Sequence, residues 1–232
     1  MFHLRILGVI VSSFQGLAGR LSNLEPWSSF SLLTPRTIDV GISRDSPPEA
    51  KTPMYIDLTP EQKTLRTTIR TYFENLMTPE IRETVKGMEG GEKYRELIRQ
   101  IGKDGWLGVG WPKEFGGGGM TMVEQMIFLE EQRRSGAPFP FVTVSTVGPA
   151  LMDYGNEGQK TEFLPRILAG DCHFAIGYSE PNAGTDLASL STAAVQDGDD
   201  WIINGTKMFT SGATDTDYIW LAARTDPDAP KH

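Results

Sequence analysis

The sequence predicts an α+β fold in which an all-helical domain precedes the start of a β-sheet domain. Between residues 58 and 170, apolar side chains recur at the three- and four-residue spacing of helices. After Gly170 the pattern changes to short apolar runs separated by Asp-Gly and Asn-Gly dipeptides, which are typical of tight hairpin turns. We therefore predict an extension without a core at residues 1–54, a helical domain at 55–170 and part of a β domain at 171–232.

The first helix has the clearest start. Thr59 can cap it, and Pro60 suits its first turn. In a later helix we expect Met122 and Met126 to lie in the core and Glu131 to lie in solvent. Residues 105–119 are too rich in glycine for regular structure. After the first, helices are expected at about 92–103, 121–135, 144–154 and 157–168.

The β part is expected to contain four strands. They are predicted at residues 174–179, 192–196, 201–203 and 218–223. The second and third strands form a hairpin about Asp197-Gly198, and Asn204-Gly205 is expected to be a second hairpin turn. Both dipeptides tolerate the positive φ that such turns need.

The composition is that of a globular protein, and it argues against several classes of function. The 232 residues carry a net charge of −8, so we expect no nucleic-acid partner, because its affinity would come from a basic patch. No apolar run approaches the roughly 18 residues of a membrane span. The single cysteine, Cys172, cannot form an internal disulfide, and only three histidines argue against a metal site or a Ser-His-Asp hydrolase. Cys172 and His173 would point to opposite faces of a strand, so we interpret both as structural.

The first 54 residues differ in composition from the rest. Through residue 44 they contain four arginines and two acidic residues, and they are rich in serine. A basic start before an apolar run fits a secretory signal, whereas arginine and serine with few acids fit a mitochondrial transit peptide. We favour an upstream extension with Met54 as the functional start, because Gln15-Gly16 interrupts the apolar region and residues 46–53 read as a proline-rich linker.

Two segments of the β part combine hydroxyl, glycine and aromatic residues. In the first, Ser179 and Thr185 flank a bend at Pro181 and Gly184, where backbone N–H groups can converge on an anion. Further along, residues 209–211 bring a phenyl ring and two hydroxyls. An aromatic wall edged with hydroxyls suits a flat ring with polar edges. The sequence thus predicts a site for an anion and a ring, without the glycine pattern of a Rossmann fold.

These segments resemble those of the acyl-CoA dehydrogenases, flavoproteins that introduce an α,β double bond into an acyl-CoA thioester. Residues 179–186 read Ser-Glu-Pro-Asn-Ala-Gly-Thr-Asp, which is similar to the family signature T-E-P-x-A-G-S-D. Residues 105–116 and 203–208 match further family motifs in the same order, so the resemblance covers about residues 55–225. The residues in these motifs are most similar to those of actinobacterial members that act on lipids and sterol side chains.

The resemblance implies that the cofactor is FAD and that both segments contact it. In the family the first segment lies along the flavin, and the position matching Thr185 also lies near the bound acyl-CoA. The residue matching Phe209 stacks on the ring, and the hydroxyl matching Ser211 lies near flavin N5. Phe209 stands where the family has tryptophan, which keeps the flat face but loses the indole N–H. The implied cofactor residues are Ile176, Gly177, Tyr178, Ser179, Ala183, Gly184, Thr185, Phe209, Thr210 and Ser211.

The resemblance also implies a β-barrel-like middle domain, followed in the family by a C-terminal helical bundle that lies beyond this sequence. The glutamate that removes the α-proton of the substrate belongs to that bundle, so no catalytic residue and no metal ligand is assigned here. The chain alone is expected to be inactive. The implied partners are an acyl-CoA substrate, an electron-transfer flavoprotein or similar acceptor and, once the enzyme is completed, like or unlike subunits of an oligomer.

Two alternatives stay open at this point. The chain could be a superfamily relative, such as an acyl-CoA oxidase or a flavin monooxygenase, which differs in what reoxidises the flavin. It could also be a non-catalytic or remnant subunit that packs against a full-length partner. The expected location is the cytoplasm, or the mitochondrial matrix if residues 1–50 are a transit peptide.

Overall fold

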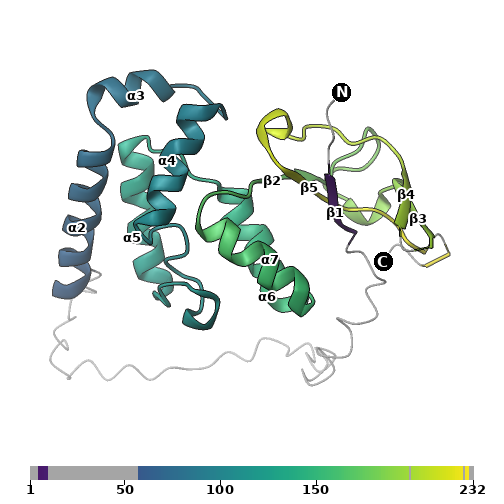
Figure 1. The fold of residues 1–232 in the computed structure, drawn as a ribbon, viewed down its shortest axis with the longest axis horizontal. Coiled ribbons are helices and arrows are strands. Elements are labelled where there is room, and N and C mark those ends of the chain that lie inside the picture. Colours follow the sequence, from purple (N-terminus) through teal and green to yellow (C-terminus); the bar gives the residue numbers. More distant parts are fainter. Residues whose placement is uncertain (1–4, 10–56, 199, 227, 230–232) are drawn as a thin grey trace, which may run out of the picture. The chain divides into compact units, whose positions relative to one another are not determined.

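The computed structural model describes residues 5–9, 57–198, 200–226 and 228–229, with only the backbone described for residues 5–9. Apart from a strand at residues 5–9, helices come first along this part of the chain and strands follow (Figure 1). The predicted α+β class is therefore confirmed. None of the helices in the described residues is long and apolar enough to cross a membrane.

The capped first helix is α2, Pro60–Leu76, which packs along α5, Met122–Ser135. The Thr59 hydroxyl accepts from the N–H of Gln62, and the Gln62 side chain accepts from the N–H of Thr59, which completes a capping box. The remaining helices are α3 (Pro79–Val85), α4 (Glu92–Lys103), α6 (Gly148–Tyr154) and α7 (Glu157–Leu168), with a short π-helix at Thr143–Val147. Of these, α3 was not expected from the sequence.

Helix α5 buries a different face from the one expected. Met122 and Met126 are exposed over 79% and 47% of their surfaces, so the prediction that they lie in the core is wrong. Glu131 is buried rather than solvated, because the guanidinium of Arg70 on α2 lies 2.7 Å from its carboxylate. This hydrogen bond lowers the pKa of Glu131. The buried face runs through Ile127, Phe128, Glu131, Gln132 and Ser135.

The glycine-rich stretch at residues 105–119 has little regular structure, as expected, beyond a single 3-10 turn at Lys113–Phe115. Trp111 within this stretch is buried and donates from Nε1 to the carbonyl of Val144 at 3.0 Å. A Cβ at Gly148 would lie 2.0 Å from the Trp111 ring, so the start of α6 can approach the indole only without a side chain. The stretch is therefore a packing element.

The strands form two small sheets. Three parallel strands lie in the order β1 (Arg5–Val9), β5 (Tyr218–Leu221) and β2 (Phe174–Gly177), and β3 (Ala193–Asp197) pairs with β4 (Asp200–Asn204) as an antiparallel hairpin. The first predicted hairpin is therefore confirmed. Within the part of the chain that the structure describes, the strands do not close into a barrel.

Two features of the β part differ from expectation. Strand β4 ends at Asn204, and no described strand returns to pair with it, so the predicted hairpin turn at Asn204-Gly205 is wrong. Gly205 instead lies against Thr192, because a Cβ there would be 2.3 Å from its Oγ1. Strand β1 falls within the extension predicted to have no core, while residues 10–54 of that extension lie outside the described residues.

Aromatic side chains hold α7 against the strands that lead to the predicted site. The Phe163 ring meets the Tyr218 ring edge-on, with centroids 5.4 Å apart, and Phe174 stacks on Tyr218 at 5.3 Å. The guanidinium of Arg166 covers the Tyr218 ring at 5.9 Å from its centroid. Each aromatic pair contributes about 0.5–1.5 kcal/mol beyond its buried area, so Phe163 holds α7 against β5 while Phe174 and Tyr218 join β2 to β5.

The contact between Gly148 and Trp111 is a test of this packing. We expect Gly148→Ala to lower the free energy of unfolding by about 1–3 kcal/mol, since the new methyl group overlaps the indole. Gly158→Ala in α7 is the matched control, because the atom nearest to its Cβ is Asn156 Oδ1 at 3.3 Å. The control should change stability by less than about 1 kcal/mol, since alanine favours helix. Urea denaturation compares the two variants, and equal losses would contradict the packing role of Trp111.

Candidate functional site

The two segments predicted to form the site are hydrogen-bonded to each other. The N–H of Met208 donates to the carbonyl of Ser179 at 2.8 Å. The ammonium group of Lys207 donates to the carbonyl of Tyr178 at 3.0 Å, across 29 residues of sequence. The end of β2 and the residues just before Phe209 therefore form one continuous piece of structure.

A buried carboxylate reinforces this junction. Glu180 Oε2 accepts from the N–H and the hydroxyl of Ser191, both at 2.7 Å, and Oε1 accepts from the N–H of Thr192 and from Lys207 Nζ, both at 2.8 Å. The side chains of Glu180 and Lys207 are only 3% and 11% exposed. Burial alone would raise the pKa of Glu180, but hydrogen bonds from Lys207, Thr192 and Ser191 outweigh it and hold that pKa far below its usual value. Glu180 thus joins the signature segment to the start of β3 and to Lys207.

The first three predicted site residues can offer a ligand little beyond their backbone. Ile176 pairs with Trp220 within the sheet, and a Cβ at Gly177 would lie 2.9 Å from Ile219 Cγ2. The Tyr178 hydroxyl accepts from Trp220 Nε1 at 3.1 Å, and the Tyr178 ring packs in a small core cluster. Their side chains shape the frame on which the following turn is carried.

The turn after Glu180 presents unused backbone donors. Ala183 is buried and exchanges backbone hydrogen bonds with Glu180 at 2.7 and 3.3 Å. Gly184 and Thr185, which follow, are exposed, and no atom lies within 4 Å of the position that a Cβ of Gly184 would take. No hydrogen bond among the described residues uses the N–H groups of Gly184 and Thr185. These amides and the Thr185 hydroxyl are therefore available to an anionic ligand.

Phe209 combines backbone strain with exposure. Its φ of 56° is the only positive value at a non-glycine residue in the described part of the chain, and 83% of its surface is exposed. Its carbonyl accepts from the N–H of Ser211 at 2.8 Å, so Thr210 lies at the centre of a tight turn. Such a backbone conformation costs about 1–3 kcal/mol and is concentrated at functional sites. The turn presents an exposed flat ring close in sequence to the exposed Ser211.

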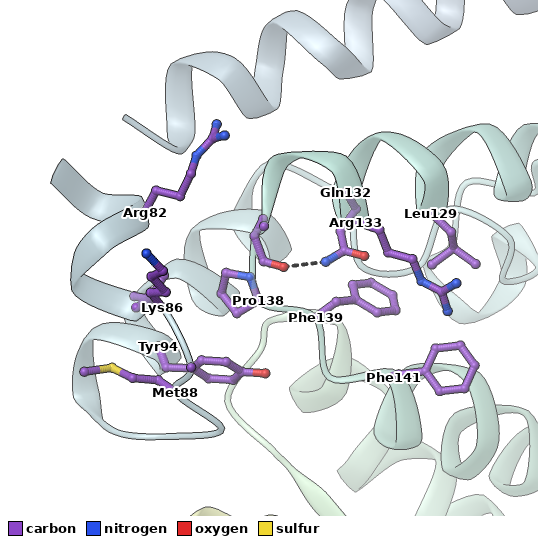
Figure 2. A pocket seen from close by; sticks show the side chains of 14 residues that line it. Arg82, Lys86, Met88, Tyr94, Leu129, Gln132, Arg133, Pro138, Phe139 and Phe141 are labelled. Atoms are coloured by element: carbon purple, nitrogen blue, oxygen red, sulfur yellow. Dashed lines mark hydrogen bonds between the residues drawn. The ribbon is translucent and has the colours of Figure 1, made fainter. Parts of the chain in front are cut away.

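The predicted residues form an open wall rather than a closed pocket. No hydrogen bond among the described residues joins 183–185 to 209–211. A cavity of about 490 Å³ lies near the end of α5 (Figure 2) and one of about 420 Å³ lies beside Trp111, but none of the predicted site residues lines either cavity. The cavity near α5 has three basic lining residues and no acidic one. No cluster of His, Cys, Asp or Glu in the described chain could hold a metal ion.

The neighbours Cys172 and His173 are buried. Burial raises the pKa of the Cys172 thiol to about 12, so the nucleophilic thiolate is scarce. Burial is also the main cause that lowers the pKa of His173, whose Nε2 lies 3.0 Å from the carbonyl of Gly170. These surroundings fit the structural interpretation of both residues.

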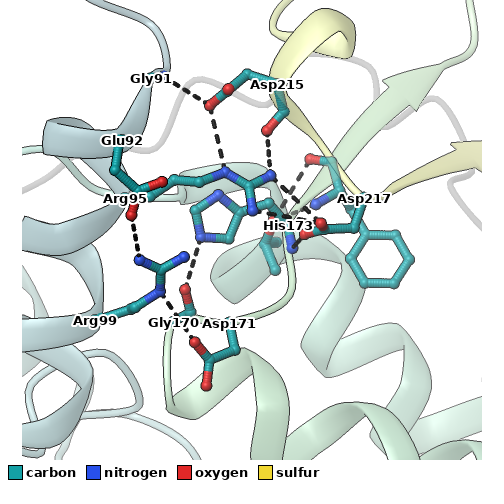
Figure 3. A network of polar contacts seen from close by, with 11 residues as sticks. Gly91, Glu92, Arg95, Arg99, Gly170, Asp171, His173, Asp215 and Asp217 are labelled. Atoms are coloured by element: carbon teal, nitrogen blue, oxygen red, sulfur yellow. Dashed lines mark hydrogen bonds and ion pairs between the residues drawn. The ribbon is translucent and has the colours of Figure 1, made fainter. Parts of the chain in front are cut away.

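Sequence reasoning assigned no role to Lys207 or to Arg95. Lys207 lies in a matched family motif, and a cation without an assigned role in that motif was the available signal. Arg95 is half-buried on α4 and contacts Asp215 and Asp217, which belong to the segment that follows Phe209 (Figure 3). The position of Arg95 in the helical pattern of α4 did not predict this contact.

Two family models match almost all of the described chain beyond residue 58. Residues 59–171 match the model of the acyl-CoA dehydrogenase N-terminal domain, and residues 175–232 match that of the acyl-CoA dehydrogenase middle domain. The chain belongs to the acyl-CoA dehydrogenase family. Both segments of the candidate site fall within the middle-domain match.

Acyl-CoA dehydrogenase FadE29 of Mycobacterium tuberculosis is 60% identical over 179 residues, which are 77% of this chain and 46% of that protein. The Tcur3481-Tcur3483 steroid ACAD has a TM-score of 0.72 at 56% identity, with 77% of this chain and 47% of that chain covered. A glutaryl-CoA dehydrogenase from Mycobacterium smegmatis in complex with FADH2 has a TM-score of 0.62 at 30% identity, with 73% and 44% covered. The chain spans about half the length of the relatives it matches.

The buried pair of Glu180 and Lys207 predicts a large effect of one substitution. Lys207→Met should lower the free energy of unfolding by about 3–5 kcal/mol, because it leaves a buried carboxylate without its cation. Lys160→Met is the control, since the partner of Lys160, Glu157, is 89% exposed. It should cost less than about 1 kcal/mol. Denaturation of both variants measures the difference, and a small loss for Lys207→Met would show that the pair does not fasten the two segments.

His173 predicts a dependence of stability on pH. Its pKa in the folded chain is below the ordinary value of 6.5, so below that pH the unfolded chain binds a proton that the folded chain resists. The free energy of unfolding should therefore fall as the pH drops below about 6.5, by at most about 1.4 kcal/mol per pH unit. His173→Gln should remove that slope between about pH 7.5 and pH 5.5. An unchanged slope in the variant would assign the dependence to other groups.

Proposed function

We propose that this chain supplies the N-terminal helical domain and one wall of the flavin site of an FAD-dependent acyl-CoA dehydrogenase. The observation that carries the proposal is the junction of the signature turn with the strained, exposed Phe209, joined through Met208 and Ser179. FAD fits this wall chemically. Its ring system suits an exposed phenyl face, and its pyrophosphate suits the free amides of Gly184 and Thr185.

The proposed role of each residue in binding FAD follows from the ring, hydroxyl or backbone group that it presents to a ligand. Phe209 would stack against the flavin, and the Ser211 hydroxyl would hydrogen-bond at its edge. Ser179 and Thr185 would contribute hydroxyls on the other segment, with Thr185 also close to the acyl-CoA thioester. The remaining cofactor residues contribute through their backbone: Ile176, Gly177, Tyr178, Ala183, Gly184 and Thr210.

Bound FAD supplies an acceptor for the hydride that leaves the β-carbon of the acyl group. The residues of this chain orient that acceptor and shield one of its faces, and none of them is assigned as the base that takes the α-proton. In the proposal that base is a glutamate of a C-terminal helical portion. This division makes the chain inactive until it is completed.

The substrate and the partners are part of the same proposal. The likeness to a steroid ACAD supports an acyl-CoA with a sterol-derived side chain as the substrate class. That relative pairs two differently named proteins, which supports assembly with a second, unlike chain as well as with copies. An electron-transfer flavoprotein or similar acceptor would reoxidise the flavin, and the enzyme would work in the cytoplasm.

Flavin retention tests the proposal. The purified 232-residue chain should be colourless and should not oxidise acyl-CoA with a dye acceptor, because half a site binds FAD weakly. Co-production with the C-terminal half of a close relative should yield a yellow complex. In that complex Ser211→Ala should weaken FAD binding by about 1 kcal/mol, or roughly fivefold, while the exposed helix residue Thr64 can be changed to alanine without effect.

The outcomes separate the alternatives. A complex without flavin would favour a non-catalytic subunit. Flavin that is reoxidised by oxygen alone at a high rate would favour an oxidase. Full FAD retention in both Ser211→Ala and Thr185→Ala would show that the site assignment is wrong even where the fold is right.

A further inference from the structure

The segment at residues 209–217, which we call the flavin-side loop, has few internal supports. Its own backbone hydrogen bonds span only two or three residues: Ser211 to Phe209 at 2.8 Å, Ala213 to Thr210 at 3.2 Å, and Asp215 to Gly212 at 2.9 Å. Turns of this kind leave a loop free to move as a body, because they close no long-range contact. What fixes the loop relative to the sheet must therefore come from outside it.

One anchor lies at each end of the loop. At its start, Met208 is bonded to Ser179. At its end, the N–H of Asp217 donates to the carbonyl of His173 at 3.0 Å, and Asp217 Oδ2 accepts from the N–H of His173 at 2.8 Å. These anchors leave residues 209–215, which include the phenyl ring and the hydroxyls, to be placed by something else.

Arg95 on α4 reaches the loop between these anchors (Figure 3). Its Nη2 donates to the carbonyl of Asp215, and its Nε lies 3.5 Å from Asp215 Oδ2. Both Nη1 and Nη2 lie 3.4 Å from Asp217 Oδ1. The Arg95 side chain is only 18% exposed, so these contacts are partly shielded from solvent. A planar guanidinium can hold two groups in a fixed geometry, which a lysine cannot do.

The chain just before α4 is shaped for the same contact. The N–H of Gly91 donates to Asp215 Oδ2 at 2.9 Å. A Cβ at Gly90 would lie 2.4 Å from the same oxygen, so a side chain there would push the loop away. The helical domain therefore contacts Asp215 through the N–H of Gly91 and the guanidinium of Arg95, and the absence of a side chain at Gly90 leaves room for this contact.

We infer that Arg95 is a positioning residue that sets the conformation of the flavin-side loop through Asp215 and Asp217. By holding Asp215 it fixes the distal end of the turn that carries Phe209 and Ser211. The helical domain thereby controls the geometry of a cofactor wall that it does not itself form. As far as the flavin is concerned, this inference rests on the proposed function, whereas the ordering of the loop does not.

Arg99 provides a matched control on the same helix. Its guanidinium pairs with Glu92 at 2.9 Å and with Asp171 at 3.1 Å, and neither partner belongs to the loop. A merely stabilising ion pair predicts similar effects for the two arginines. A positioning role predicts a difference between them that is confined to the loop.

Hydrogen exchange on the full chain, followed by mass spectrometry, tests the ordering. Arg95→Ala should speed exchange of the amides at residues 209–217 by about tenfold relative to the unaltered chain, while Arg99→Ala leaves them within about twofold. Arg95→Lys keeps the charge without the planar fork and should give an intermediate rate, which also guards against misfolding of the alanine variant. Equal rates in the loop for Arg95→Ala and Arg99→Ala would overturn the inference.

Titration of the same variants with FAD, followed by quenching of flavin fluorescence, tests the consequence for the site. The unaltered chain should bind weakly, Arg95→Ala should raise the apparent Kd about tenfold, and Arg99→Ala should not change it. If neither the unaltered chain nor its complex with the C-terminal half of a relative binds FAD while the exchange result holds, the proposed function fails and the positioning role of Arg95 stands. If Arg95→Ala binds FAD as tightly as the unaltered chain, the loop is ordered by Arg95 but the flavin does not depend on it, and the inference about the site is wrong.

Discussion

The buried carboxylate of Glu180 is the constraint on which the candidate site depends. The Glu180 side chain is only 3% exposed. Its negative charge can be buried only because Lys207, Ser191 and Thr192 surround the carboxylate with donors at 2.7–2.8 Å. Removing any one of these donors would leave the buried carboxylate with fewer hydrogen bonds than it needs, and losing Lys207 would also remove its counter-charge. The signature turn, the start of β3 and Lys207 therefore take their positions together.

This rigid junction explains how an exposed and strained residue can sit beside it. Phe209 pays about 1–3 kcal/mol for its backbone conformation and gains little from burial, since 83% of its surface is exposed. A flexible segment would relax to a more common conformation. Here Met208 is fixed on one side by Ser179, and Asp215 is fixed on the other by the start of α4. Strain at one residue is thus maintained by hydrogen bonds at its neighbours.

Local signals in the sequence were enough to predict most helices, but not the contacts that build the site. The capping box at Thr59 follows from side chains within one turn of each other. Helix α4 follows from the helical spacing of Leu97, Ile98 and Ile101. Helix α3 is only seven residues long, although Thr78-Pro79 marks its start. The exposure of Met122 was missed because apolar spacing does not say which face of a helix meets a neighbour. The family motif predicted both segments of the candidate site, yet the pair of Glu180 and Lys207 spans 27 residues and is set by tertiary structure.

The negative net charge of the chain means that local backbone donors, and not the overall charge, have to attract an anionic ligand. At a net charge of −8, the molecule as a whole repels an anionic dinucleotide. That repulsion acts over about 8 Å at physiological ionic strength, whereas a hydrogen bond from a backbone N–H acts only at contact. In the proposed function, attraction to a pyrophosphate would therefore come from oriented donors such as those of Gly184 and Thr185, and their orientation depends on the turn that Glu180 and Ala183 close. The Glu180 carboxylate belongs to the same segment as these amides, but the Lys207 ammonium group lies 2.8 Å from it, so the pair adds no net charge that opposes the anion.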